Sequence, residues 1–314
     1  MSSLFRPVLS KNIRQYLELT KFKLSVLNGI VTVASFSMYA TPISPLPLFL
    51  SSVALSMSTQ TLNQYIEVEY DRKMKRTSQR PLVLGMNPNY ALVNGVMLGA
   101  VGLGGLATYG PMTALVGSAI WGGYLFVYTR MKRESELNTL VGSVIGSLPV
   151  YLGWIASGRS YCMIEPFAMF VYMMAWQHQH FYGIRWIYFD DYNNAGFKME
   201  KNKRMAAAQI VFQTVATLVF TNYALMYYNV PYCWAMNGVL SGGLYYWGLK
   251  PSFQFAENLI SARELKMQSY KHFCLVFVVF ILCRIFGEKP TEESIQERKY
   301  GRGKEEGLIF DVYY

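Results

Sequence analysis

Apolar residues along the chain fall into long runs that are separated by short stretches containing charged residues, proline or glycine. A run of about 17–25 apolar residues is long enough for a helix to cross the hydrocarbon core of a bilayer. The runs are continuously apolar and do not alternate at every second residue, which favours helices over barrel strands. We place about nine spans at residues 24–40, 46–66, 90–108, 111–129, 138–157, 162–182, 205–229, 231–249 and 272–287. The pattern therefore predicts an all-α, polytopic membrane protein.

The composition supports the same class. Of the 314 residues, 52% are hydrophobic and only 15% are charged, whereas charged residues make up about a quarter of a soluble domain. These values argue against a water-soluble enzyme, and the 16% of aromatic residues argues against a solvated, disordered chain. Glycines four residues apart, Gly95 with Gly99 and Gly142 with Gly146, predict faces on which membrane helices approach closely.

The basic residues are distributed unevenly between the two sides of the predicted bundle. The N-terminal segment and the loops after the second, fourth, sixth and eighth spans hold 22 of the 29 Lys and Arg residues, whereas the connections after the odd-numbered spans contain only Arg159. By the positive-inside rule, the basic side faces the cytoplasm, or the matrix in a mitochondrion. The net charge of +10 also suits anionic substrates. We expect the lipid bilayer to be a partner of this protein, and we expect no nucleic-acid partner.

We divide the chain into three parts. Residues 1–20 form a short basic segment with serines and few acids, which is typical of matrix targeting. Residues 21–287 form the transmembrane domain, and residues 288–314 form a polar C-terminal tail.

A column of polar residues is predicted at the end of the second span. Asn63, Glu67 and Asp71 are spaced by four residues, which places their oxygen atoms on one face of a helix. That face should point into the bundle, because lipid is a costly environment for it. Oxygen donors without His or Cys suit Mg²⁺, and the following Arg76 and Arg80 can bind phosphate oxygens. The pattern indicates a metal–diphosphate site; the alternative is a salt-bridged, solvated helix end.

Two further polar clusters follow the fourth and sixth spans. The cluster after the fourth span contains Lys132, Arg133 and Asn138. The cluster at the end of the sixth span contains Trp176, Gln177, His178 and His180, followed by Asp191 and Tyr192. The two histidines are two residues apart, so on a helix they point about 200° from each other and cannot ligate one metal ion side by side. We expect His178 and the later His272 to be structural.

The three clusters resemble the motifs of the UbiA superfamily of intramembrane prenyltransferases. Residues 63–71 are similar to its NxxxDxxxD motif, and the following DRKMKRTSQRPL most closely resembles the protoheme IX farnesyltransferase branch. The signatures YT-x-x-KR-x-[ST]-x-x-N-x-x-x-G and W-Q-x-P-H-F match from Tyr128 and from Trp176 onward, and the resemblance covers roughly residues 15–285. Glu67 stands where bacterial members have Asp, and mitochondrial members show the same change to Glu. Leu84 replaces the Arg that is usual at its position, and Gln179 replaces the proline of the W-Q-x-P-H-F signature.

The resemblance implies transfer of a farnesyl group from farnesyl diphosphate to the vinyl group of protoheme IX, giving heme O, a step towards the heme A of cytochrome c oxidase. It implies that the Asn63 column holds Mg²⁺ on the diphosphate, with Asp191 placing a second ion. Lys132 and Arg133 would bind the diphosphate or a haem propionate, and His180 would ligate the haem iron, position the porphyrin edge or accept a proton. The remaining substrate-binding candidates are Arg76, Arg80, Asn138, Trp176, Gln177 and Tyr192.

Two alternative functions remain at this stage. One is a UbiA-type prenyltransferase that acts on a quinone precursor, and the other is a non-catalytic haem-binding or transport protein. The expected partners of the preferred function are farnesyl diphosphate, protoheme IX, the lipid bilayer and heme A synthase. Glu67 and the basic N-terminal segment favour the mitochondrial inner membrane, with the bacterial inner membrane as the alternative.

Overall fold

The computed structural model describes residues 11–38, 41–158, 164–200, 202–227 and 262–286, and these residues form helices and no strand. The helices are α1 Lys11–Leu19, α2 Phe22–Phe36, α3 Pro45–Lys73, α4 Pro88–Ala107, α5 Pro111–Gly122, the π-helix η1 Gly123–Tyr128, α6 Thr129–Glu134, α7 Asn138–Ala156, α8 Ile164–Ile187, α9 Phe189–Asn194, α10 Lys203–Tyr227 and α13 Ala262–Phe286. The predicted all-α class is confirmed.

Most predicted spans coincide with helices of the structure. The span predicted at 231–249 lies outside the described residues, so the count of nine stays a prediction. Among the described residues, three stretches are long and apolar enough to cross a membrane: Pro88–Ala107, Pro111–Glu134 and Asn138–Ala156. The last helix begins at Ala262 and not at residue 272. The charges in its first turns, Arg263, Glu264 and Lys266, explain why an apolar pattern misses them.

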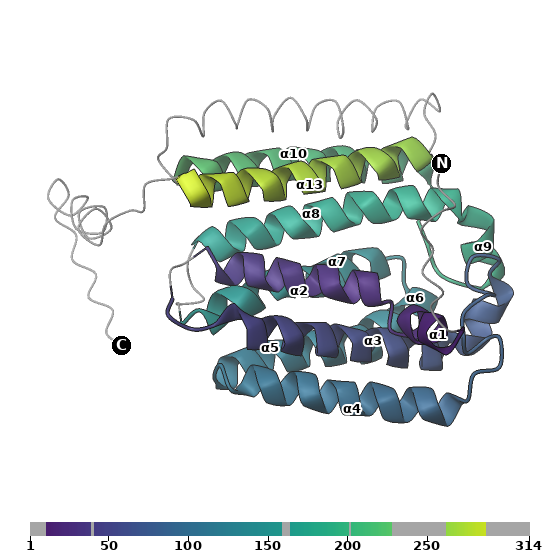
Figure 1. The fold of residues 1–314 in the computed structure, drawn as a ribbon. Helices are drawn as coiled ribbons and strands as arrows, with labels where there is room; N and C mark the ends of the chain where they lie inside the picture. Colours follow the sequence, from purple (N-terminus) through teal and green to yellow (C-terminus); the bar gives the residue numbers. More distant parts are fainter. Residues whose placement is uncertain (1–10, 39–40, 159–163, 201, 228–261, 287–314) are drawn as a thin grey trace, which may run out of the picture.

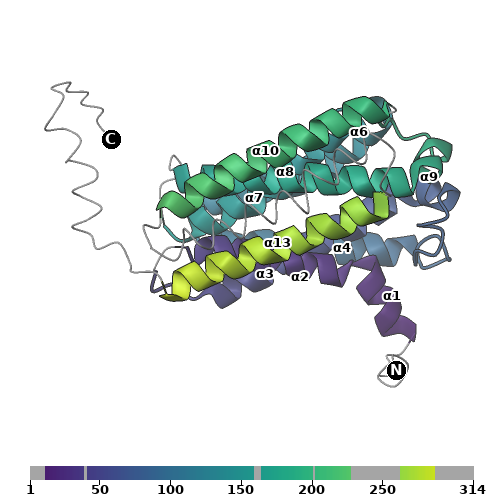
Figure 2. The same cartoon turned by 90° about the horizontal axis from the view of Figure 1, so that it is seen from above.

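Five helices form a closed ring of neighbours. Helix α3 packs between α2 and α4, α7 packs between α2 and α5, and α4 contacts α5 (Figure 1). Helix α8 packs on α7 and in turn contacts α10 and α13, which lie on different sides of it (Figure 2). Buried Phe36, Leu48, Leu55, Leu106 and Leu152 join α2, α3, α4 and α7 into one apolar core.

Small residues allow these helices to approach closely, as predicted. A Cβ atom on Gly95 would lie 2.6 Å from the Leu62 side chain of α3, and one on Gly99 would lie 2.9 Å from the Ser58 hydroxyl. Gly142 packs against the Tyr128 ring and Gly146 against the Gln177 amide. The predicted close faces of α4 and α7 are therefore confirmed.

The described segments that were predicted to share one side, namely the N-terminal helix and the loops after the second, fourth and sixth spans, meet at one end of the bundle. Helices α1, α6 and α9 and the segment after α3 lie together there (Figure 1). Met74 packs in one apolar cluster with Tyr192, Phe197 and Met199. The Lys198 amide donates a hydrogen bond to the Lys132 carbonyl at 2.7 Å. Chain segments that are far apart in sequence are thus brought next to the end of α3.

Candidate active site

The predicted column of oxygen-bearing side chains exists on α3. Asn63, Glu67 and Asp71 are 1%, 6% and 3% exposed, although the last two carry carboxylates. Burying a carboxylate is costly unless it is paired and hydrogen-bonded. Each member of the column has a partner from a different segment of the chain, and the prediction that the column faces the protein interior is confirmed.

Glu67 forms an ion pair with Lys132 of α6. The Lys132 Nζ donates to Oε1 at 3.0 Å and to Oε2 at 3.1 Å, and the two side chains are 8% and 12% exposed. The ammonium also lies 4.6 Å from the centroid of the Tyr128 ring, within the range of a cation–π contact. The first and second polar clusters of the sequence therefore form one site.

Asp71 pairs with Arg80 of the loop that follows α3. Arg80 Nη1 donates to Asp71 Oδ2. The hydroxyl of Thr77 donates to the Asp71 carbonyl at 2.9 Å, which folds the loop back over the end of α3. A solvated helix end, the alternative interpretation, is contradicted by the burial of this pair.

Asn63 contacts a π-helical turn that hydropathy did not predict. Its Nδ2 donates to Thr129 Oγ1 at 3.1 Å, and the same hydroxyl donates to the Tyr124 carbonyl at 2.8 Å, five residues back. The π-helix η1 interrupts the predicted continuous span 111–129. Such bulges frequently occur at functional sites. Here the bulge directs Tyr124 and Tyr128 towards Lys132.

The third cluster borders the loop after α3. Asp191 Oδ2 accepts a hydrogen bond from the Arg76 backbone amide at 3.0 Å. The Arg76 guanidinium lies 5.7 Å from the centroid of the Tyr192 ring. Arg133 donates to the Tyr70 hydroxyl at 3.1 Å. Asn138 Nδ2 donates to the Lys198 carbonyl at 2.6 Å, and the Lys198 amide in turn donates to the Lys132 carbonyl. Substrate binding by Asn138 stays a prediction.

The donor set of the column fits Mg²⁺. Within the described residues, no three side chains among His, Cys, Asp and Glu gather closely enough to hold a metal ion by themselves. Mg²⁺ usually binds one or two carboxylates and completes its octahedral shell with water and substrate phosphates. Glu67 and Asp71, one helical turn apart, with the Asn63 amide beside them, match that requirement. Asp191 as a ligand of a second ion stays a prediction.

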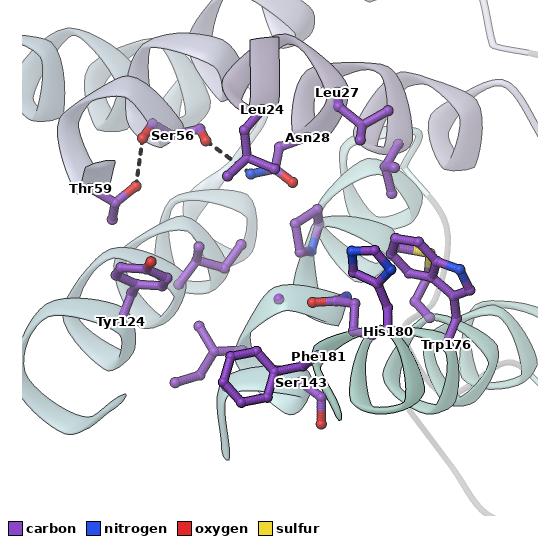
Figure 3. Close-up of a pocket in the computed structure, with 18 of the residues that line it drawn as sticks. Leu24, Leu27, Asn28, Ser56, Thr59, Tyr124, Ser143, Trp176, His180 and Phe181 are labelled. Carbon is purple, nitrogen blue, oxygen red and sulfur yellow. Dashed lines mark hydrogen bonds between the residues drawn. The ribbon is translucent and has the colours of Figure 1, made fainter. Parts of the chain in front are cut away.

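A cavity of about 380 Å³ opens between α2, α3, α7, α8 and α13. It falls within the size range of small-molecule sites, about 300–1,000 Å³. Trp176 and His180 of α8 lie on one side, and Ser56 and Thr59 of α3 on the other (Figure 3). Gln177 also lines the cavity, and it donates to Ser147 Oγ at 3.3 Å. The predicted residues of α8 therefore share one mostly apolar cavity.

The other histidines are directed elsewhere. His178 faces α10, where its Nδ1 lies 3.3 Å from Gln213 Nε2, and its ring stacks on Tyr182. His272 is 3% exposed and its ring lies 6.1 Å from the Tyr172 ring. Neither residue lines the cavity. The prediction that only His180 has a functional position among the three agrees with this arrangement.

Lys21 is a site residue that the sequence analysis missed. Its Nζ donates to Gln60 Oε1 at 2.8 Å, and its backbone lies in the left-handed region at φ 41°. Burial and the positive charges of Arg80 and Lys132 hold the pKa of the Lys21 ammonium well below its usual value. A hollow of about 780 Å³ beside it is lined by Arg14, Lys23, Arg76 and Arg80 as well as Lys21. In the sequence, Lys21 is one of several topology signals, and only its position in the fold distinguishes it.

The chain is similar to proteins of known class over most of its length. The sequence model of the UbiA prenyltransferase family matches residues 29–257. A protoheme IX farnesyltransferase of Koribacter versatilis is 31% identical over 304 residues, covering 89% of this chain and 96% of that relative. A mitochondrial protoheme IX farnesyltransferase of Yarrowia lipolytica is also 31% identical, over 269 residues, with 82% of this chain covered. The chain spans a little over half of that relative, 56%.

Solved structures share the fold. A UbiA homolog from Archaeoglobus fulgidus bound to GPP and Mg²⁺ aligns with a TM-score of 0.62, covering 85% of this chain and 99% of that chain. The sequence identity over this alignment is only 15%, so the similarity concerns the arrangement of the helices and not the individual residues.

Proposed function

Since this chain belongs to the UbiA prenyltransferase family, we propose that it transfers the farnesyl group of farnesyl diphosphate to the vinyl group of protoheme IX and so makes heme O. The bacterial and mitochondrial relatives named protoheme IX farnesyltransferase support this choice of substrates. The observation that carries the proposal is the meeting of buried Glu67 and Asp71 with Lys132 and Arg80. Buried pairs of acidic and basic side chains suit a diphosphate with its metal ion, and not a ligand that is only apolar.

We propose that Asn63, Glu67 and Asp71 hold Mg²⁺ on the diphosphate. The A. fulgidus homolog bound to GPP and Mg²⁺ supports the pairing of Mg²⁺ with a prenyl diphosphate in this fold. When bound, the ion supplies positive charge that makes the diphosphate a better leaving group. Because Lys132 and Arg80 are already aimed at the two carboxylates, small side-chain movements can transfer their hydrogen bonds to phosphate oxygens.

The basic residues then stabilise the charge that develops during ionisation. The bond between C1 of the farnesyl group and the bridging oxygen breaks, and both electrons leave with the diphosphate. We propose that Lys132 and Arg80, which pair with the two carboxylates, stabilise this negative charge together with Arg76 and Arg133. Preorganised donors in a water-poor site contribute several kcal/mol each to such a transition state, about 10²–10³ in rate.

The apolar cavity accommodates the farnesyl chain and the reacting edge of the porphyrin. The terminal carbon of the haem vinyl group attacks C1, forming the new carbon–carbon bond and leaving a cation beside the pyrrole ring. Water adds to that cation and loses a proton, which gives the hydroxyl of the hydroxyethylfarnesyl product. Trp176, Phe181 and Phe273 line the cavity and limit the access of other water to the allylic cation.

The carboxylates of α3 provide the test. We expect Glu67→Gln and Asp71→Asn each to lower heme O formation by about 10²–10³, because each removes a charge that binds the metal or fixes a phosphate-binding base. Glu69→Gln is the matched control, since Glu69 is on the same helix but its side chain is 68% exposed and pairs with Arg72 on the surface. Full conversion by either column variant would contradict the proposal. Membranes supplied with both haem b and 4-hydroxybenzoate would reveal a quinone-precursor enzyme by prenylation of the second compound.

The compartment and the recipient of the product belong to the same proposal. Similarity to the mitochondrial relative of Y. lipolytica and the presence of Glu67 support the mitochondrial inner membrane. The K. versatilis relative is equally similar, so subcellular fractionation has to decide between that membrane and a bacterial inner membrane. We propose heme A synthase as the protein that receives heme O.

A further inference from the structure

The His180 ring is held by residues of two helices. Trp176, one turn earlier on α8, stacks on it with the centroids 5.2 Å apart and the planes within 11°. Tyr270 of α13 meets it edge-on at 4.3 Å. The neighbouring Ser269 contacts His180 Nδ1 through its hydroxyl at 2.7 Å and accepts the Trp176 indole N–H at its carbonyl at 2.8 Å. Ser269 is 1% exposed, so these contacts are not shared with solvent.

The hydrogen bonds of Ser269 determine where the imidazole proton lies. Its hydroxyl has one hydrogen, and that hydrogen is donated to the Lys266 carbonyl at 2.7 Å. A carbonyl can only accept, so the Ser269 oxygen is left as an acceptor towards His180. The Nδ1 atom must therefore carry the proton. In the neutral ring, the lone pair then resides on Nε2.

The Nε2 atom is the one available to a ligand. His180 lines the cavity, whereas Ser269, which binds Nδ1, does not. Among the described residues, Nδ1 is the ring nitrogen that contacts the Ser269 hydroxyl. A neutral imidazole nitrogen with a free lone pair is a competent ligand for haem iron.

We infer that Ser269 is a positioning residue that fixes the Nδ1–H tautomer of His180 and so presents Nε2 to the iron of the haem substrate. This inference rests on the proposed function for the identity of the ligand, but not for the tautomer. When a histidine binds a metal through one ring nitrogen, a hydrogen bond donated by its other ring nitrogen raises the basicity of the ligating atom. Loss of such an outer partner typically costs about 10–100-fold in metal affinity or activity.

The tautomer is tested first, without haem. Full-length protein labelled with ¹⁵N-histidine reports the protonation of each ring nitrogen by its chemical shift, and a His180→Gln difference spectrum assigns the His180 signals. We expect protonated Nδ1 and unprotonated Nε2 in the wild type, and a mixture of tautomers in Ser269→Ala. Ser157→Ala is the control, because Ser157 is also buried and donates to a carbonyl three residues back, but contacts no histidine. Protonation at Nε2 in the wild type would overturn the inference.

The iron contact is tested next with ferrous haem b added to the same protein in nanodiscs. We expect the wild type to show an iron–histidine stretching band in resonance Raman spectra. The band should disappear in His180→Ala and shift to lower frequency in Ser269→Ala. In Ser269→Thr its frequency should return to the wild-type value. Haem affinity should fall by about 10–100-fold in Ser269→Ala and recover in Ser269→Thr.

The two proposals can fail separately. A wild-type protein that shows the band but makes no heme O leaves the inference standing and overturns the proposed function. A protein that makes heme O while its band is unaffected by His180→Ala or by Ser269→Ala overturns the inference alone. Failure to take up haem would overturn the proposed function and the iron contact, whereas the tautomer is decided by the ¹⁵N spectra.

Discussion

Lys21 shows how a single side chain can be costly to the empty protein and useful to the proposed complex. The Lys21 ammonium has a neutral amide as its hydrogen-bond acceptor, while Arg80 and Lys132 add repulsion. Gln64 donates to the Glu18 and Leu19 carbonyls at the end of α1, which holds the turn before Lys21 in place. A diphosphate bound nearby would supply the missing negative charge. We therefore assign Lys21 to the binding of the anionic substrate.

Replacing Lys21 should separate stability from binding. Folding lowers the pKa of Lys21, so the charged form destabilises the folded protein below that lowered pKa, and the penalty declines as the pH rises towards the unfolded value near 10.5. We expect Lys21→Met to raise the thermal unfolding temperature of the substrate-free protein at pH 7, by a margin that shrinks as the pH approaches 10. Farnesyl diphosphate should bind about 10–100-fold more weakly, as expected when a charged hydrogen bond is lost. Lys11→Met, on the exposed face of α1, should change neither quantity; equal effects of the two substitutions would contradict the assignment.

Residues of the site differ in how far the sequence could predict them. The spacing of Asn63, Glu67 and Asp71 by four residues is a local property of one helix, so the column was predictable from its periodicity. The pairing of Glu67 with Lys132 spans 65 residues, and the contact of His180 with Ser269 spans 89. Contacts of this kind depend on the packing of separate helices, which no local pattern encodes. Ser269 therefore went unnoticed, although it touches a residue that was predicted.

At the scale of elements, apolar runs predicted helices well and predicted their irregularities poorly. The run predicted at 111–129 is divided into α5 and η1, and α6 begins at Thr129. The backbone N–H of Thr129 donates to the carbonyl five residues back, at Tyr124. Such π-helical bonding does not change the hydropathy of the run, so hydropathy could not predict it. Helix α3 extends to Lys73, beyond the predicted end of the membrane span at residue 66, as the helical column predicted through Asp71 requires. In these last turns Glu67 and Asp71 are buried, whereas Glu69 and Arg72 are exposed. Both deviations occur at the candidate active site.

The packing of α2 on α7 depends on the absence of a side chain at Gly153. A Cβ atom there would overlap the Thr32 carbonyl oxygen of α2, which is backbone and cannot rotate away. We expect Gly153→Ala to destabilise the protein by about 1–3 kcal/mol, the usual cost of overpacking. Gly104→Ala on α4 is the matched control, because a Cβ atom at Gly104 meets nothing within 4 Å. Thermal unfolding in detergent measures both, and equal stability of the two variants would refute the close approach.

At the scale of the whole molecule, the two ends of the bundle have different chemistry. One end collects α1, α6, α9 and the loop after α3, with the basic hollow and the ion-paired carboxylates (Figure 1). The apolar cavity extends from there between the helices. A substrate with an anionic head and a long apolar tail, such as farnesyl diphosphate, matches this division, and so does haem with its propionates at one edge.

This polarity makes a prediction about topology that is independent of catalysis. Positions 79 and 136 follow α3 and α6 and are exposed at the basic end, whereas position 108 follows α4 at the opposite end of that helix. In a chain whose four native cysteines are replaced by serine, we expect Gln79→Cys and Glu136→Cys to react with a membrane-impermeant maleimide from the same side of sealed vesicles. Thr108→Cys should react only from the other side. The positive-inside rule assigns the basic end to the cytoplasm or matrix. The reagent should therefore label positions 79 and 136 in inside-out vesicles. Labelling of position 108 together with them would show that the loops of the site do not share one side of the membrane.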